Sequence, residues 1–355
     1  MTTVQVMLGE RSYPVRIRAG GLAEMAESAA SELGMERVVV ITTPRVGKAW
    51  FDTLAAGLER AQVELMRLEV PDGERAKTMR TASRIYDQLL DLAVDRQTFM
   101  LGLGGGAACD LTGYVASTWL RGVPLLQVPT TLLAQVDASV GGKTAVNHPR
   151  GKNLIGTFYQ PRQVWVDPEV LRTLPRREFR CGLAEVIKAG ALWDAEFFAW
   201  LEQEIEAVSA REPEALARAI TRAIEIKAEV VSLDEREGGL RALLNFGHTL
   251  AHAIENVAGY RRVRHGEAVA MGMVFACRLS ERRGRIGPDV TARVEDLLVR
   301  AGLQTTPPDW SGQRDAYLRA IAVDKKVAGG KVGFVVLDEL GRAEVLQLTP
   351  QEILE

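Results

Sequence analysis

The chain has 355 residues, of which 47% are hydrophobic and 25% are charged, and its formal net charge is -2. This length favours two domains, and the absence of a basic excess argues against a nucleic-acid partner. No run approaches the roughly 18 apolar residues of a membrane span, and the charged N-terminal segment is unlike a signal peptide. Three widely spaced cysteines are typical of a reducing compartment, so a cytoplasmic location is expected.

In the first half of the chain, short apolar segments alternate with helical patterns. Strands are predicted at residues 37–41, 63–70, 99–103 and 123–128, and helices at about 45–60 and 78–93. Short strands that are apolar on both faces, with helical crossovers between them, are typical of a buried parallel sheet. We therefore predict a Rossmann-like, doubly wound α/β domain over residues 1–175.

The pattern changes after two proline-marked stretches, at 161–168 and 173–175. Long helical patterns follow at 185–200, 213–234, 247–258, 266–283 and 290–301, with a late β-hairpin at 331–337 and 343–348. Residues 176–355 are predicted to form a second, mainly α-helical domain that binds metal.

A glycine-rich turn, Leu-Gly-Leu-Gly-Gly-Gly-Ala at 101–107, follows a predicted strand and opens a helix. Read as G-x-G-x-x-A, it matches the dinucleotide fingerprint, in which glycines admit a pyrophosphate to the helix N-terminus. The usual acidic ribose partner is absent, because nothing acidic lies between Asp110 and Asp137. The loop Asp72-Gly73-Glu74, with Lys77 beyond it, is a substitute at the same sheet edge. A packing turn without a ligand is the alternative.

The stretch 140–144, Val-Gly-Gly-Lys-Thr, superficially resembles a P-loop. That motif requires a glycine where Asp137 stands, so a P-loop is excluded.

The chain has four histidines, and three of them, His248, His252 and His265, fall within eighteen positions. His248 and His252 are spaced i, i+4 on one predicted helical face, which Asn245 shares, and His265 begins the next helix. Plain packing is the alternative, but the clustering favours a metal site.

Charged residues interrupt two apolar helical faces. Glu185 is the best candidate for a further metal ligand, with Lys188 at i+3, and Lys227 interrupts a second face. Surface positions on amphipathic helices are the alternative for all three. Two histidines and one glutamate would make an open, catalytic zinc site. Beside a nicotinamide, such an ion would assist hydride removal from an alcohol.

Motifs along most of the chain resemble those of the 3-dehydroquinate synthases. They lie, in the family's order, at 104–113, 120–124, 128–144, 151–161, 182–188, 225–228, 241–255, 265–270 and 324–326. Two departures leave the chemical groups intact: Ala107-Ala108-Cys109 in the glycine turn, and Leu250-Ala251 in the histidine helix.

The resemblance implies a role for each matching position. Glu185, His248 and His265 would bind zinc or cobalt, which frees His252 for substrate binding or catalysis. NAD would contact Asp72, Gly73, Glu74, Arg75, Ala76, Lys77, Gly104, Gly105, Gly106, Ala107, Ala108, Cys109, Asp110, Thr130, Thr131, Lys143, Lys152, Val170, Leu171, Arg172 and Thr173. Substrate would meet Asp137, Lys143, Lys152, Asn153, Lys188, Lys227, Arg241, Asn245, His252 and Lys325, and Arg121 would reach the partner's site in a homodimer.

The family's substrate is 3-deoxy-D-arabino-heptulosonate 7-phosphate, an anion that matches the many cations. The implied reaction is transient oxidation by NAD, elimination of phosphate, re-reduction and an intramolecular aldol closure to 3-dehydroquinate, within the shikimate pathway of aromatic amino acid biosynthesis. Three alternatives remain: another sugar phosphate cyclase, a metal-dependent polyol dehydrogenase, and a non-catalytic NAD-binding protein. The dehydrogenase would release NADH, and a decayed site should have lost some of these residues.

Overall fold

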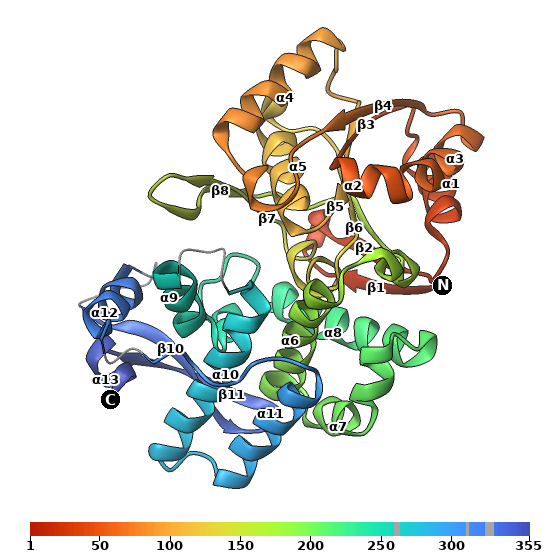
Figure 1. The fold of residues 1–355 in the computed structure, drawn as a ribbon. Coiled ribbons are helices and arrows are strands. Elements are labelled where there is room, and N and C mark those ends of the chain that lie inside the picture. The colour runs from red at the N-terminus through yellow and green to blue at the C-terminus, as the bar shows by residue number, and fades with distance from the viewer. Residues whose placement is uncertain (259–262, 310–311, 324–329) are drawn as a thin grey trace. The chain divides into compact units, whose positions relative to one another are not determined.

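The structure is a computed structural model that describes residues 1–258, 263–309, 312–323 and 330–355 (Figure 1). The chain divides into two compact units. The first comprises Met1–Pro175 with Lys227–Ser232, and the second comprises Arg176–Ile226 with Leu233–Glu355. These units differ from the two predicted domains only by the six residues 227–232. Within this segment, Ser232 Oγ accepts a hydrogen bond from the Met7 N–H at 2.9 Å.

A seven-stranded sheet forms the centre of the first unit. Its strands run in the order β1 (Thr2–Val6), β2 (Tyr13–Ile17), β9 (Gln163–Val166), β6 (Leu125–Pro129), β5 (Phe99–Gly104), β3 (Arg37–Thr42) and β4 (Glu64–Glu69). All neighbours pair in parallel except β1 and β2. The four predicted strands are confirmed, and so is the doubly wound α/β class. Strands β1, β2 and β9 were not predicted.

Helices and short turns connect these strands. They are η1 (Gly9–Arg11), α1 (Leu22–Leu33), α2 (Pro44–Val46), the π-turn η2 (Gly47–Phe51), α3 (Asp52–Arg60), η3 (Gly73–Arg75), α4 (Met79–Asp91), α5 (Gly106–Thr118), η4 (Trp119–Arg121), the π-turn η5 (Ala134–Ala138) and η6 (Pro168–Thr173). The helices predicted at 45–60 and 78–93 are confirmed, the first with a π-turn inside it.

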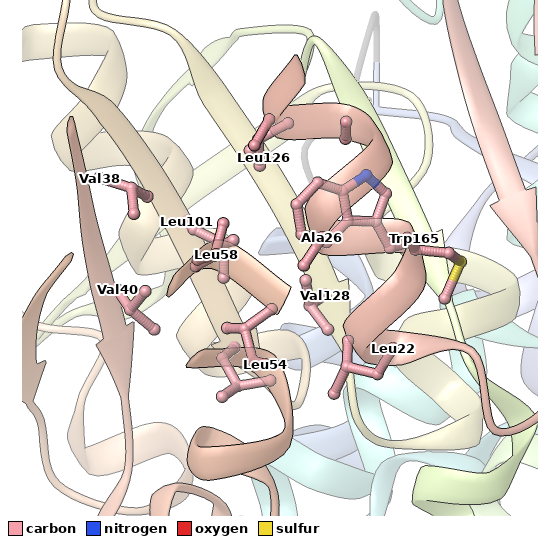
Figure 2. Packing of buried hydrophobic residues seen from close by; sticks show 14 of the residues in the cluster. Leu22, Ala26, Val38, Val40, Leu54, Leu58, Leu101, Leu126, Val128 and Trp165 are labelled. Carbon is pink, nitrogen blue, oxygen red and sulfur yellow. The ribbon is translucent and has the colours of Figure 1, made fainter. Parts of the chain in front are cut away.

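Two hydrophobic clusters involve alternate residues of the same strand. Val38 and Val40 of β3 belong to a cluster that includes Trp165 (Figure 2), whereas Val39 and Ile41 belong to a second cluster. Successive side chains of a strand point to opposite faces, so β3 must be covered on both sides. This explains its unbroken apolar sequence.

A separate two-stranded hairpin follows β6. It pairs β7 (Lys143–His148) with β8 (Gly151–Phe158) in antiparallel register, and Figure 1 draws it as a ribbon distinct from the main sheet. This hairpin was not predicted from the sequence. Gly141 and Gly142, with φ of 98° and 67°, turn the chain into β7, so a strand and no helix follows the excluded P-loop stretch.

The second unit is mainly helical. Its elements are α6 (Arg176–Trp193), α7 (Ala195–Ala210), α8 (Pro213–Leu233), η7 (Leu240–Asn245), α9 (His248–Ala258), α10 (His265–Arg282), α11 (Pro288–Arg300), α12 (Arg314–Val323), β10 (Val332–Glu339), β11 (Arg342–Leu348) and α13 (Pro350–Leu354), with 227–232 of α8 counted in the first unit. The late hairpin and the helical class are confirmed.

One predicted helix is wrong in its bounds. The pattern at 185–200 was read as continuous, but α6 ends at Trp193 and α7 begins at Ala195. Asp194 leaves the helical conformation, and its Oδ1 accepts the Phe197 N–H at 2.9 Å, which caps α7.

Cys109, Cys181 and Cys277 are free and buried. Among the described residues, no helix is both long and apolar enough to cross a membrane.

Candidate active site

Four predicted dinucleotide segments follow the carboxyl ends of parallel strands. The turn 104–110 follows β5, Thr130 and Thr131 follow β6, the loop 72–77 follows β4, and the segment 170–173 follows β9. Strand order reverses between β3 and β5, since β4 lies on one side of β3 and β5 on the other. Ligands of open α/β sheets bind outside the carboxyl ends at such a reversal.

The glycine turn is tight because neighbouring side chains approach it. A Cβ added to Gly104 would lie 2.6 Å from the Ala108 Cβ, and one added to Gly105 would lie 2.9 Å from the Thr131 Cγ2. None of the three glycines at 104–106 has a positive φ. Close approach, and not a left-handed backbone, is therefore what requires glycine here. The missing side chains allow the close packing seen here, and they would also allow a ligand to approach the backbone of the turn.

The turn offers groups that suit an anionic dinucleotide. Helix α5 begins at Gly106 with no acidic residue in its first turn, so its positive end is not neutralised locally. Thr130 is buried, and its Oγ1 has no hydrogen-bond partner within the described ranges. A buried hydroxyl without a partner is costly unless a ligand satisfies it. These residues fit the cofactor.

Lys77 links the 72–77 loop to α5. Its buried Nζ donates to Asp110 Oδ2 at 2.5 Å and to Asn153 Oδ1 at 2.5 Å. Burial opposes the charge of Lys77, but Asp110 and Glu74 outweigh it and raise the pKa of this lysine. The loop at 72–77 therefore reaches the glycine-turn helix through Lys77, and its role as a substitute for the acidic ribose partner stays a prediction.

Asp167, which was not predicted to have a role, fixes the fourth segment. This buried carboxylate accepts N–H bonds from Gly20, Leu22 and Glu169 at 2.8–3.1 Å, and so caps η6. Burial raises the pKa of Asp167, although these bonds act in the opposite direction. Thr173 at the end of η6 accepts the Trp50 indole N–H at 2.9 Å. An Asp-Pro pair at the predicted break was the available signal.

In the second unit, Glu185 lies at the centre of a cluster of ionisable groups on α6. Its side chain is 2% exposed and forms an ion pair with Lys188, one turn along the helix. Its Oε1 lies 3.5 Å from His248 Nε2 and 3.7 Å from His265 Nε2. Neither carboxylate oxygen has a partner with hydrogen-bond geometry in the described part of the chain. The surface alternative is wrong for Glu185 and Lys188, because both are buried.

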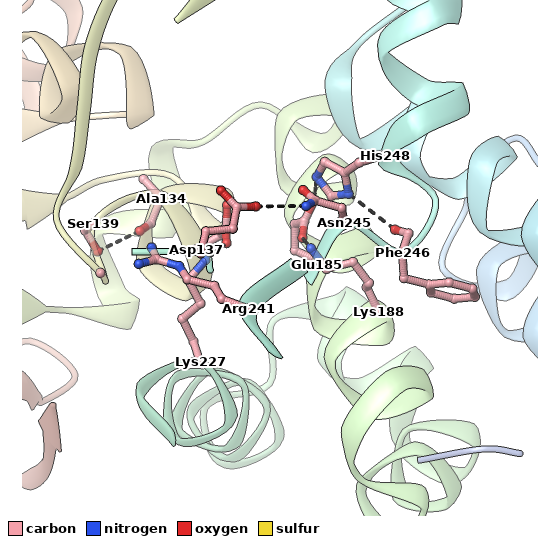
Figure 3. Close-up of polar contacts among 12 residues, drawn as sticks. Ala134, Asp137, Ser139, Glu185, Lys188, Lys227, Arg241, Asn245, Phe246 and His248 are labelled. Carbon is pink, nitrogen blue, oxygen red and sulfur yellow. Dashed lines mark hydrogen bonds and ion pairs between the residues drawn. The ribbon is translucent and has the colours of Figure 1, made fainter. Parts of the chain in front are cut away.

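Both imidazoles are held by their Nδ1 atoms. His248 Nδ1 lies 3.2 Å from the Phe246 carbonyl oxygen, and His265 Nδ1 lies 3.3 Å from Glu255 Oε2 (Figure 3 draws the first contact). A proton on each Nδ1 leaves each Nε2 lone pair available, and both Nε2 atoms lie near Glu185. One ligand atom from each of Glu185, His248 and His265 lies within 4.8 Å of the others.

Glycines allow the three helices to approach closely enough for this cluster. A Cβ added to Gly266, beside His265, would lie 2.3 Å from the Cys181 carbonyl oxygen on α6. A Cβ on Gly272 of α10 would lie 2.0 Å from the carbonyl oxygen of Gly247, the residue before His248. Gly247 itself has a φ of 79°. These contacts fix the two histidines relative to Glu185.

The electrostatics of the cluster favour a cation. Burial would raise the pKa of Glu185, but Lys188 and the two imidazoles hold it well below its usual range. Burial, with Lys188, lowers the pKa of His248 to about 3, so this imidazole is neutral and can act as a ligand. Burial opposes the charge of His265, yet Glu185 and Glu255 raise its pKa to about 10. Two carboxylates thus favour positive charge at that position, and the donor set fits zinc or cobalt.

His252 lies beside this group. Its ring centroid is 5.6 Å from that of His248 and 6.4 Å from that of His265. The i, i+4 relation of His248 and His252 in one helix is as predicted. Asn245 does not share that helix, because it ends η7 and Gly247 separates it from α9. The expectation for Asn245 is therefore wrong in its reason, and its Nδ2 donates to Glu237 Oε1 at 2.9 Å.

The other predicted substrate residues are distributed over both units. In the first, Lys227 forms an ion pair with Asp137 and is 11% exposed, so a purely solvated position is wrong for it. Arg241, in the second, is 1% exposed and donates to the Glu235 carbonyl oxygen. Lys143 begins β7, Lys152 and Asn153 lie on β8, and Arg121 is exposed with a φ of 70°. Lys325 lies outside the described residues.

Two solved structures that share this fold are sugar phosphate cyclases. A 2-deoxy-scyllo-inosose synthase complexed with carbaglucose-6-phosphate, NAD+ and Co2+ is 26% identical, with a TM-score of 0.88, and the match covers 99% of this chain and 98% of that one. The 2-epi-5-epi-valiolone synthase of Streptomyces hygroscopicus subsp. jinggangensis 5008, with NAD+ and Zn2+ bound, is 29% identical, with a TM-score of 0.87 and coverage of 98% and 96%.

Sequence comparison narrows this class. Residues 67–181 match the family model described as 3-dehydroquinate synthase N-terminal, and residues 182–327 match 3-dehydroquinate synthase C-terminal. A 3-dehydroquinate synthase of Geotalea uraniireducens (strain Rf4) is 48% identical over 341 residues, 96% of this chain and 94% of that protein. The chain belongs to the 3-dehydroquinate synthase family.

Proposed function

We propose that the chain converts 3-deoxy-D-arabino-heptulosonate 7-phosphate into 3-dehydroquinate and phosphate, with bound NAD and one divalent ion, zinc or cobalt. The observation that carries the proposal is the buried cluster of Glu185, His248 and His265 in a chain of this family. By outcome the enzyme is a carbon–oxygen lyase, since the bond between carbon and the phosphate ester oxygen breaks. The hydride removed first is returned later, so no NADH accumulates.

The two cofactors have separate binding residues. When bound, NAD supplies a reversible hydride acceptor, and the divalent ion supplies a Lewis acid that lowers the pKa of a substrate hydroxyl. Glu185 offers a carboxylate oxygen and the two histidines offer Nε2 atoms, because their Nδ1 atoms are already engaged. The four loops at the sheet edge hold the dinucleotide, with Thr130 Oγ1 as a buried polar contact.

Cationic side chains bind the carboxylate and phosphate of the substrate. Lys188 and Arg241 are nearly fully buried, and buried cations need anionic or hydrogen-bonding partners. Asp137 holds Lys227 in place through their ion pair. Lys143, Lys152, Asn153, Asn245 and Lys325 complete the proposed substrate contacts.

Proton transfer needs few dedicated groups. Oxidation of the hydroxyl releases a proton, and His252, beside the metal-binding histidines, is placed to bind the substrate or to move that proton. The new ketone acidifies the neighbouring C–H bond. An oxygen of the departing phosphate takes the carbon-bound proton while the C–O bond breaks. Re-reduction, ring opening and aldol closure then complete the reaction.

One assay separates this function from its rivals. The purified chain receives the heptulosonate phosphate, a catalytic amount of NAD and zinc, and both phosphate release and absorbance of NADH are followed. We expect many phosphates released per NAD and no accumulated NADH. NADH in proportion to product would indicate a polyol dehydrogenase. Turnover only with a hexose phosphate or another heptulose phosphate would indicate a different cyclase.

The oligomeric state and the cellular location of the enzyme also belong to this proposal. A homodimer, with Arg121 reaching the partner's site, and a cytoplasmic location both stay predictions from the sequence. Arg121 is exposed, and Leu120 and Arg121 both have positive φ, at 48° and 70°, which is unusual for residues other than glycine. A fully active monomer in light scattering would contradict the shared site.

A further inference from the structure

Asn147 occupies an irregular position in the β7–β8 hairpin. The register of the two strands shifts there, because Val146 pairs with Ile155 and His148 pairs with Gly151, so Asn147 lies opposite a bulge of β8 at residues 152–154. Bulges redirect a side chain and are common beside functional sites. Asn147 is half-buried and lies outside every set of binding residues proposed above.

Three hydrogen bonds connect Asn147 to its surroundings. Its backbone N–H donates to the Lys77 carbonyl oxygen at 2.8 Å, and its Nδ2 donates to Glu74 Oε2 at 2.7 Å. Its Oδ1 accepts the Asn153 N–H at 2.9 Å. Two of these bonds reach the dinucleotide loop, and the third crosses the hairpin to a proposed substrate residue.

The far end of this network is strained. Asn153 has a φ of 55°, and Asn147 Oδ1 holds its N–H while Lys77 Nζ holds its side-chain oxygen at 2.5 Å. A left-handed backbone outside glycine persists only where the surroundings fix it. Of these two groups, Lys77 belongs to the 72–77 loop and Asn147 is bonded to Glu74 of that loop.

From this network we infer that Asn147 is a positioning residue that couples occupancy of the dinucleotide loop to the geometry of the substrate hairpin. Glu74 and Lys77 take defined positions when the loop binds NAD, and Asn147 transmits those positions to Lys152 and Asn153. The inference rests on the proposed function, because it requires that the 72–77 loop binds NAD. It adds a residue to that function without giving it a contact with any ligand.

Hydrogen exchange in the hairpin tests the coupling directly. Exchange of the amides of residues 143–158 is measured in the full-length protein with and without saturating NAD. In the wild type we expect NAD to slow this exchange. In Asn147→Ala we expect NAD still to bind, with a dissociation constant within about threefold of the wild type, but the exchange no longer to respond. The KM for the heptulosonate phosphate should rise about tenfold, the value of one or two lost hydrogen bonds.

Two further variants provide the controls. Asn147→Asp keeps the acceptor for Asn153 but places a second negative charge against Glu74, so the coupling should again be lost without shortening the side chain. It also serves if Asn147→Ala fails to fold. Thr157→Val removes two hydrogen bonds of the same hairpin, one at 2.9 Å to Ser117 of α5 and one at 2.8 Å to Thr144 of β7. That variant should exchange faster throughout while still responding to NAD.

The outcomes separate this inference from the proposed function. If NAD slows hairpin exchange equally in the wild type and Asn147→Ala, or in neither protein although both bind NAD, the coupling is overturned. If Asn147→Ala abolishes NAD binding itself, Asn147 shapes the loop and does not connect it to the hairpin, which also overturns it. If the wild type does not bind NAD in calorimetry, the proposed function fails first.

Discussion

In the first unit, four loops at one sheet edge each contribute a few small or polar groups to the candidate dinucleotide site. In the second, three helices bring three ionisable side chains within 4.8 Å of one another. The loops depend on backbone and packing, as in the contact between Gly105 and Thr131, whereas the helices depend on charge. Single substitutions in the dispersed dinucleotide loops should therefore lower NAD affinity only slightly. Single substitutions in the buried charged cluster should lower metal affinity strongly.

The largest effect is expected at Glu185. Glu185→Gln keeps the size of the side chain but removes the charge that balances Lys188 and attracts a cation. We expect metal affinity to fall about a hundredfold or more, because the partners of a broken buried ion pair remain uncompensated. Metal content after dialysis against a graded chelator measures this. Unchanged metal content would remove Glu185 from the ligand set.

The next largest effect is expected at Gly266, where α10 packs closely against α6. Gly266→Ala places a Cβ 2.3 Å from the Cys181 carbonyl oxygen, so α10 must shift away from α6. We expect the free energy of unfolding to fall by about 2–3 kcal/mol, a typical cost of overpacking, and metal affinity to fall with it as His265 moves. Urea unfolding of the metal-free protein measures the first quantity. Gly312→Ala is the control, because an added Cβ there meets no heavy atom within 4 Å. Equal stability of both variants would contradict the packing argument.

The two regions also differ in how far the sequence predicted them. The turn 104–110 and the loop 72–77 follow predicted apolar strands, and local pattern was enough to place these two at one edge. Thr130, Thr131 and the segment 170–173 entered only through the family resemblance. Glu185 was found because a charge in an apolar run needs a partner. The choice of His265 as the third candidate ligand depended on the family resemblance, since its approach to Glu185 arises from the contact between Gly266 and Cys181, which no local pattern encodes.

The errors have the same physical origin. The break at Asp194 depends on one side-chain cap inside an otherwise continuous helical pattern. Asn245 was assigned to the face of His248 because helical spacing runs through Gly247, whose positive φ separates the two. The β7–β8 hairpin was missed since β8 is only partly apolar and half-exposed. Asn147 contacts Glu74, which is distant in sequence, and Glu255 contacts His265 on the next helix. The periodicity of apolar residues does not predict such contacts.

A smaller effect is expected at Glu255, whose Oε2 lies 3.3 Å from His265 Nδ1. Glu255→Gln retains an acceptor near His265 Nδ1 but removes the charge that favours the orientation of this ring. Metal affinity should fall about tenfold, as for other carboxylates that orient a ligating histidine. Glu281→Gln on the same helix as His265 is the control. A loss as large as that of Glu185→Gln would mean that Glu255 is itself a ligand.

The smallest effect, and the sharpest test of the contrast between the two regions, is expected at Gly105. An alanine there can adopt the observed φ of -74° and ψ of 178°, so its one obstacle is the Thr131 Cγ2 at 2.9 Å. Displacing Thr131 should weaken NAD binding about fivefold in calorimetry, a cost of about 1 kcal/mol, and leave metal affinity unchanged. Thr131→Ser removes that methyl group but keeps the hydroxyl that accepts the Ala134 N–H. In a Thr131→Ser background, Gly105→Ala should therefore have almost no effect on NAD affinity. If the full loss persists in that background, the glycine is required for access of the ligand to the backbone and not for packing against Thr131.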